Sequence, residues 1–309
     1  MCGIVGLFLK DSTLQPHLGP LLSDMLITMT DRGPDSAGIA IYGGEAEGLS
    51  KLTIQSENPE VDFIGLDTKL STALGQRVVM TIKSTHAVLV LPRGLLDTAR
   101  AALATLNPAL RVMSRGDSIE IYKEVGLPKD VSARFDLPSM GGTHGIGHTR
   151  MATESAVTTL GAHPFNTGED QCLVHNGSLS NHNSLRRKLR REGIQIETEN
   201  DTEVGAAYLT WRMQQGATLG QALESSLRDL DGFFTFVVGT RDGFGVVRDP
   251  IACKPAVMAE TDRYVAFGSE YRALVNLPGI DDARVWEPEP ATVYFWSHNT
   301  GPDATEKAA

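Results

Sequence analysis

A cysteine at position 2 is the first residue of this 309-residue chain that could act as a nucleophile. It directly precedes GIVGLFL, an apolar run that is typical of a strand. Removal of the initiator methionine, which the small size of Cys2 favours, would make the cysteine N-terminal. Its α-amino group, whose reference pKa is about 7.7–8.0, could then accept the thiol proton. The alternative is a buried structural cysteine in the first strand, since free cysteine is among the most buried residue types.

Groups that could complete such a site lie in segments rich in small and polar residues. These segments are RGPDSAG (32–38), GHTRMATES (147–155), VHNGSLSNHNSL (174–185) and NDTEV (200–204). Asn176 and Gly177 offer an amide side chain and an approachable N–H to an oxyanion. Arg150 suits a carboxylate, and Asp201 suits an ammonium group. Taken singly, these residues also fit a turn, an ion pair and a helix cap.

Several motifs occur together and in a fixed order along nearly the whole chain. They are Cys2-Gly3-Ile4, RGPDSAG, GHTRMAT, AHPF (162–165), HNG (175–177), NDTEV and DGFFTFVV (231–238). In this combination the chain resembles the class II glutamine amidotransferases, a family of N-terminal-nucleophile hydrolases. The resemblance implies an α+β fold, an αββα four-layer sandwich of two antiparallel sheets. It also implies hydrolysis of L-glutamine to glutamate and ammonia through a thioester on Cys2.

The resemblance assigns catalytic, substrate-binding and supporting roles to individual positions. They are the nucleophile Cys2, the oxyanion-hole residues Asn176 and Gly177, the substrate-binding residues Arg150, Thr153 and Asp201, and the supporting residues Arg32 and His163. Arg150 would hold the α-carboxylate of glutamine, and Asp201 its α-amine. Met151 stands where the family has tryptophan, so closure of the glutamine pocket is expected to differ.

The hydrophobic pattern predicts the elements that must position these residues. Residues 2–9 are strand-like, and an amphipathic helix is expected within PHLGPLLSDMLITMTDRG (16–33). Further helices are expected at 181–193, 201–216 and 218–230. Residues 44–74 have a weak, loop-like pattern, whereas 75–127 predicts a small β-α-β-β unit. We interpret 75–127 as a subdomain inserted in a domain that spans 1–300, with a flexible tail at 301–309.

Composition and charge argue against several classes of function. A formal net charge of −10 argues against nucleic acid as a partner. No stretch approaches the ~18 consecutive apolar residues that a membrane span requires. The three cysteines, Cys2, Cys172 and Cys253, are far apart and predict neither a disulfide framework nor a zinc site. We therefore expect a cytoplasmic protein with no cofactor and no metal in this chain.

The motifs occupy most of the chain, which suggests that the ammonia is used by a separate protein. The motifs run from residue 2 to about 255, and strands continue to about 297, which leaves no room for an acceptor domain. We therefore expect L-glutamine as substrate and a separate synthase subunit as partner. The chain most resembles the amidotransferase subunit of glutamate-synthase-like complexes, including the N-methylglutamate synthase type. The alternatives are a non-catalytic subunit in which Met1 is not removed, and a hydrolase of another amide.

Overall fold

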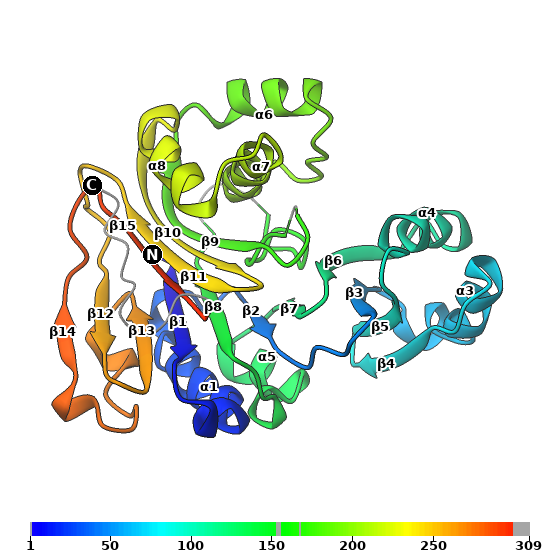
Figure 1. Ribbon diagram of the computed structural model, residues 1–309, viewed down its shortest axis with the longest axis horizontal. Coiled ribbons are helices and arrows are strands. Elements are labelled where there is room, and N and C mark those ends of the chain that lie inside the picture. Colours follow the sequence, from blue (N-terminus) through cyan, green and yellow to red (C-terminus); the bar gives the residue numbers. More distant parts are fainter. Residues whose placement is uncertain (1, 153–155, 167, 299–309) are drawn as a thin grey trace.

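The computed structural model describes residues 2–152, 156–166 and 168–298, and its main body contains two stacked antiparallel sheets (Figure 1). The first sheet has the order β14 (Arg284–Trp286), β12 (Val257–Glu260), β13 (Tyr264–Gly268), β1 (Gly3–Leu9), β8 (His144–Arg150), β2 (Ser36–Tyr42) and β7 (Ile119–Val125). The second has the order β15 (Val293–Ser297), β11 (Gly243–Arg248), β10 (Gly232–Thr240) and β9 (Cys172–Leu179).

Helices cover the outer face of each sheet (Figure 1). The first sheet carries α1 (Leu18–Thr28) and α5 (Pro128–Arg134), and the second carries α6 (His182–Arg191), α7 (Asp201–Gln214) and α8 (Leu219–Asp229). Short 3₁₀ turns occur at Ser12–His17, Thr30–Arg32, Leu137–Ser139, Tyr271–Ala273 and Ile280–Asp282. The expected αββα arrangement of an α+β fold is therefore confirmed.

The alternation of side chains along β1 explains the layering. Val5 and Leu7 face α1 in one buried cluster, whereas Ile4 and Phe8 lie in a second cluster between the two sheets. At Gly6 a Cβ would approach the Phe244 ring of the opposite sheet to 2.6 Å. The glycine that interrupts the apolar run therefore lets the two sheets approach closely at this point.

A third, smaller sheet projects from the main body (Figure 1). Its order is β4 (Val79–Lys83), β5 (His86–Pro92), β3 (Leu49–Gln55) and β6 (Arg111–Gly116), and α2 (Pro59–Asp62), α3 (Leu66–Leu74) and α4 (Leu96–Leu106) belong to the same region. Leu52 and Ile54 of β3 pack with Leu66 and Leu70 of α3 in one buried cluster. The expectation of loop at 44–74 is therefore wrong, because this range contains strand β3, in which every residue except Leu49 is buried, together with the helices α2 and α3.

The structure also changes the boundaries of the predicted insertion. Strand β7 pairs with β2 along its whole length, so it belongs to the first sheet rather than to the small one. The strands of the small sheet come from residues 49–116, a different range from the predicted 75–127. The predicted tail at 301–309 lies outside the described residues. Within the described ranges, no helix is both long and apolar enough to cross a bilayer.

Buried histidines make the stability of this fold sensitive to acid. Burial lowers the pKa of His86, His144 and His148 to about 3, compared with about 6.5 in an unfolded chain. Between these two values the unfolded chain binds more protons than the folded one. The stabilisation is therefore complete above about pH 6.5 and is lost as the pH falls below it.

We predict that the free energy of unfolding falls by about 1.4 kcal/mol per pH unit for each such histidine below about pH 6. Urea unfolding at pH 7.5, 6.0 and 5.0 measures this slope. His86 packs between the rings of Tyr122 and Phe135, so a His86→Phe variant should keep the packing. Its free energy of unfolding should fall less steeply with decreasing pH, by about 1.4 kcal/mol per pH unit. An unfolding free energy that is constant across this range would contradict the prediction.

Candidate active site

The backbone of Cys2 is held from both layers of the sandwich. Arg32, in the turn after α1, donates from Nε to the carbonyl oxygen of Cys2 at 2.9 Å. Asn176 of β9 donates from Nδ2 to the same oxygen at 3.2 Å. The Cys2 residue is half-buried, and the β1–β8 register, in which Gly3 faces Thr149, sets it next to Arg150. Three predicted site residues, Cys2, Arg32 and Asn176, are thus brought together by direct contacts.

A segment that the sequence analysis did not single out also anchors the start of β1. Ser269 accepts a hydrogen bond from the Ile4 N–H on its hydroxyl oxygen, and its own N–H donates to the Ile4 carbonyl, both at 2.9 Å. Glu270 binds the guanidinium of Arg32 at 2.7 Å, and this hydrogen bond is the main reason why its pKa is lowered. Arg32 therefore links Cys2 to the 269–270 segment, which follows the buried strand β13.

The backbone conformation at position 177 requires glycine. Gly177 has φ +146, and a Cβ there would lie 2.0 Å from the carbonyl oxygen of Phe233 on the paired strand β10. Only glycine avoids both the strained dihedral and the clash. Because Asn176 precedes it and already contacts Cys2, the arrangement leaves the Asn176-Gly177 end of β9 beside the candidate nucleophile. Such a strand end can offer donors to an oxyanion.

Asp201 opens α7 but does not act as its cap. Asn200 is the N-cap, since its side chain accepts from the Thr202 N–H at 2.9 Å. Asp201 instead accepts from the Leu179 N–H at 2.9 Å and lies 3.7 Å from Nδ1 of His175. Burial acts to raise the pKa of Asp201, but the nearby His175 ring and the hydrogen bond from the Leu179 N–H outweigh it and lower this pKa to about 2. The carboxylate is therefore ionised at neutral pH and suits an ammonium group.

Three buried histidines connect the two sheets near this site. His163 stacks on His148 with ring centroids 4.0 Å apart, and Nε2 of His148 lies 3.2 Å from the carbonyl oxygen of His175, to which it donates. His175 in turn contacts Thr202 through Nδ1 at 3.1 Å. Burial lowers the pKa of His148 to about 3 and that of His163 well below its ordinary value, so both rings are neutral. These imidazoles are therefore suited to holding the layers together.

His148 and His175 were not predicted as site residues, although both lie in motif segments, GHTR and HNG. Within the described part of the chain, no group of three or more His, Cys, Asp or Glu side chains is arranged to hold a metal ion.

A buried lysine fixes the loop that carries His163. Lys123 of β7 donates from Nζ to the carbonyl oxygens of Leu160, Ala162 and Pro164 at 3.2, 2.8 and 3.2 Å. The same nitrogen lies 4.4 Å from the centre of the Phe165 ring. Burial lowers the pKa of Lys123 to about 8. Nothing in the local sequence around Lys123 indicates this role, because its three acceptors are about 40 residues away along the chain.

The remaining predicted residues lie at the end of β8. The side chain of Arg150 is buried, and its Nη1 donates to the carbonyl oxygen of Ala156 at 3.2 Å. Met151, which follows it, is 38 % exposed. Thr153 lies outside the described residues, so its predicted place in the glutamine pocket stays a prediction.

Comparison with solved structures defines the fold class. The chain superposes on the B. subtilis glutamine phosphoribosylpyrophosphate (PRPP) amidotransferase, complexed with ADP and GMP, with a TM-score of 0.61 and 19 % identity, covering 96 % of this chain and 48 % of that one. The structure described as the allosteric regulatory enzyme of purine biosynthesis gives a TM-score of 0.63 and 19 % identity, covering 96 % and 47 %. The fold is thus that of the N-terminal-nucleophile hydrolase amidotransferases.

The chain belongs to the class II glutamine amidotransferase family. Residues 148–276 match the family model described as a glutamine amidotransferase domain. Over 298 residues the chain is 74 % identical to the "Glutamine amidotransferase-like protein GlxB" of Rhizobium meliloti (strain 1021), a match that covers 96 % of this chain and 99 % of that protein.

The close approach at Gly177 predicts a large loss of stability on substitution. Gly177→Ala should lower the free energy of unfolding by about 3 kcal/mol or more, because it adds a clash to an unfavourable dihedral. Gly216 is the matched control: its φ is +91, but a Cβ there has nothing within 4 Å. Gly216→Ala should cost only about 1 kcal/mol. Equal losses for the two variants in urea unfolding would show that the Phe233 contact is not a constraint.

Proposed function

We propose that this chain hydrolyses L-glutamine to L-glutamate and ammonia, with Cys2 as nucleophile and the freed α-amino group of Cys2 as base. The observation that supports this most is the shared contact at the Cys2 carbonyl, where Arg32 of the first layer and Asn176 of the second converge. The nucleophile and the candidate oxyanion donors therefore occupy one site. In a member of this family, that arrangement fits acyl transfer from an amide.

The proposed reaction proceeds in two acyl-transfer steps. The α-amine of Cys2 accepts the thiol proton, and the thiolate attacks the side-chain carboxamide carbon of glutamine. Asn176 and the Gly177 N–H would stabilise the oxyanion while the α-ammonium returns a proton to the leaving nitrogen, which departs as ammonia. Water then adds to the γ-glutamyl thioester, the amine accepts a proton from it, and the thiolate leaves with glutamate released.

Substrate orientation in this proposal depends on charge complementarity. The α-carboxylate of glutamine pairs with Arg150, and its α-ammonium pairs with the ionised Asp201. Thr153 would line the side-chain channel, while Arg32 and His163 support the site without contacting the reacting atoms. The proposal requires no metal or cofactor in this chain.

We further propose that the ammonia passes to a separate synthase subunit of the glutamate synthase or N-methylglutamate synthase type, in the cytoplasm. One observation supports a separate partner, and another supports the compartment. The GlxB relative is matched over 99 % of its length, whereas the PRPP amidotransferase chain is about twice as long as the region matched. The cysteines, Cys2, Cys172 and Cys253, are free thiols, which fits a reducing compartment.

We predict that intact-mass analysis will show a chain without Met1 that gains one adduct from 6-diazo-5-oxo-L-norleucine, a glutamine-analogue electrophile. Cys2→Ser should abolish the adduct, because the thiolate is the nucleophile. Cys253→Ser, which alters an exposed thiol, should leave labelling intact. A protein that retains Met1 and stays unlabelled, even with co-purifying partners present, would contradict catalysis and favour a structural subunit that kept the fold.

His175 should act as a positioning residue for Asp201. His175→Leu removes the Nδ1 contact that helps to keep Asp201 ionised and oriented, so KM for glutamine should rise about tenfold with a smaller change in kcat. His175→Asn keeps a donor near the Nδ1 position and should restore most of the affinity. Steady-state kinetics of both variants test this. A fall in kcat with KM unchanged would contradict this role and would instead show that His175 supports the candidate oxyanion donors, Asn176 and Gly177.

A further inference from the structure

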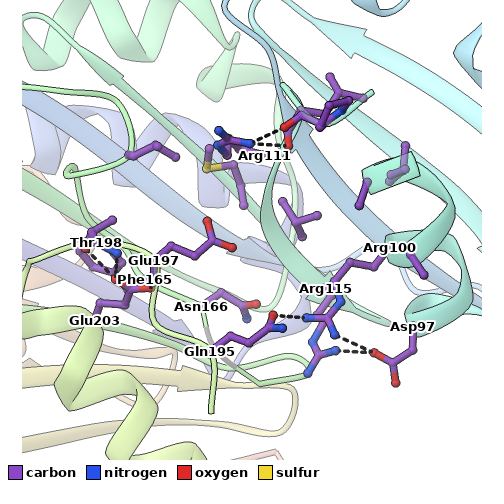
Figure 2. Close-up of a pocket in the computed structure, with 18 of the residues that line it drawn as sticks. Asp97, Arg100, Arg111, Arg115, Phe165, Asn166, Gln195, Glu197, Thr198 and Glu203 are labelled. Carbon is purple, nitrogen blue, oxygen red and sulfur yellow. Dashed lines mark hydrogen bonds and ion pairs between the residues drawn. The ribbon is translucent and has the colours of Figure 1, made fainter. Parts of the chain in front are cut away.

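A cleft of about 710 Å³ separates the small sheet from the second layer (Figure 2). One wall is formed by α4 and β6, and the other by Phe165, Asn166, Gln195, Glu197 and Thr198. The volume is within the range of about 300–1,000 Å³ that is usual for small-molecule sites, which often lie between structural units. Neither Cys2 nor Arg150 nor Asp201 lines this cleft, so it is distinct from the candidate active site.

The wall formed by α4 and β6 carries more positive than negative charge. Arg115 and Arg100 share one carboxylate, that of Asp97, at 2.8 and 3.8 Å, and Arg100 also donates to the side chain of Gln195 at 3.0 Å. Arg111 donates from Nη1 to the carbonyl oxygens of Pro108 and Leu110. Among the described residues, Arg111 has no carboxylate partner.

The opposite wall presents the carboxylate of Glu197, whose charge acts on the buried ammonium of Lys123 through space. The Glu197 side chain projects into the opening that the arginines border (Figure 2). Its backbone N–H binds Glu203 at 2.7 Å, but within the described ranges its carboxylate has no hydrogen-bond or ion-pair partner. Glu203 itself is occupied by the N–H groups of Glu197 and Thr198.

The other charged group at the cleft is not available to a ligand. Lys123 lines the cleft, but its ammonium is buried and donates to three backbone carbonyls. Arg100 and Arg115 share the single carboxylate of Asp97. Among the described residues that line the cleft, the charged groups with no ion-pair partner that face the opening are the guanidinium of Arg111 and the carboxylate of Glu197, on opposite walls. A ligand with a single charge would leave one of them unmatched.

We propose that this cleft binds a free α-amino acid, with its α-carboxylate on Arg111 and its α-ammonium on Glu197. A zwitterion matches both charges at once, and the guanidinium can hold a carboxylate through two parallel hydrogen bonds. Gln195 and Asn166 border the same space and supply amide groups for a side chain. The site is additional to the glutamine site and does not depend on the proposed reaction.

Calorimetric titration of the full chain tests this site. An Asp201→Asn variant, in which the candidate active site is impaired, is titrated with glycine, L-alanine, L-glutamate and L-glutamine. We expect at least one of these to bind with one equivalent, and acetate and ethylamine, which carry one charge each, to bind at least about tenfold more weakly. Adding Arg111→Gln or Glu197→Gln should each weaken binding about tenfold or more.

The matched control is Arg187→Gln, which removes an exposed positive charge from α6 outside the cleft. This variant should bind as tightly as its Asp201→Asn parent. The proposal is overturned if none of the amino acids binds, if acetate binds as well as they do, or if binding is unaffected by Arg111→Gln and Glu197→Gln. Each readout is a binding constant, so a chain without glutaminase activity can still support or refute the cleft site.

Discussion

The carbonyl oxygen of Cys2 is the point on which the candidate site depends, because it accepts hydrogen bonds from both layers of the sandwich. Arg32 approaches it from the first layer, and Asn176 approaches it from the second. The spacing between these layers therefore decides whether both donors reach the oxygen, and packing between the sheets helps to set it. The cluster that contains Ile4 and Phe8 fills the space between the sheets, and such interiors are close-packed and resist compression. The core between the sheets is therefore also what positions the chemistry.

Neutral imidazoles add polar contacts to this apolar interface. His148 reaches from the first sheet to a carbonyl of the second, and His163 stacks on it from the loop that Lys123 holds. A charged group in the same position would have to be desolvated, at considerable cost. The lowered pKa of His148 shows that the fold avoids this cost by keeping the ring neutral.

The sequence predicted those parts of the fold that have a local cause. Strand β1 and helix α1 follow from apolar periodicity, and α8 begins with a capping box in which Thr218 and Gln221 exchange hydrogen bonds. Strand β3 was missed because a lysine interrupts its pattern. Lys51 is buried there, since it binds Glu120 at 2.7 Å and the carbonyl of Gly43. Partners that lie so far along the chain cannot be inferred from the residues next to the strand.

The motifs predicted which residues meet at the candidate site, but they did not predict the residues that hold the site in place. Asn176 meets Cys2 and Asp201 meets His175, but Ser269 and Glu270 act through contacts across more than 200 residues.

Lys123 shows a further consequence of such long-range contacts. Its ammonium directs its protons to three carbonyl groups at once, whereas the guanidinium of arginine is flat and larger. A lysine-to-arginine exchange, which substitution tables score as mild, would here leave carbonyl groups without donors. For this position, chemical similarity is a poor guide to which residues evolution can accept.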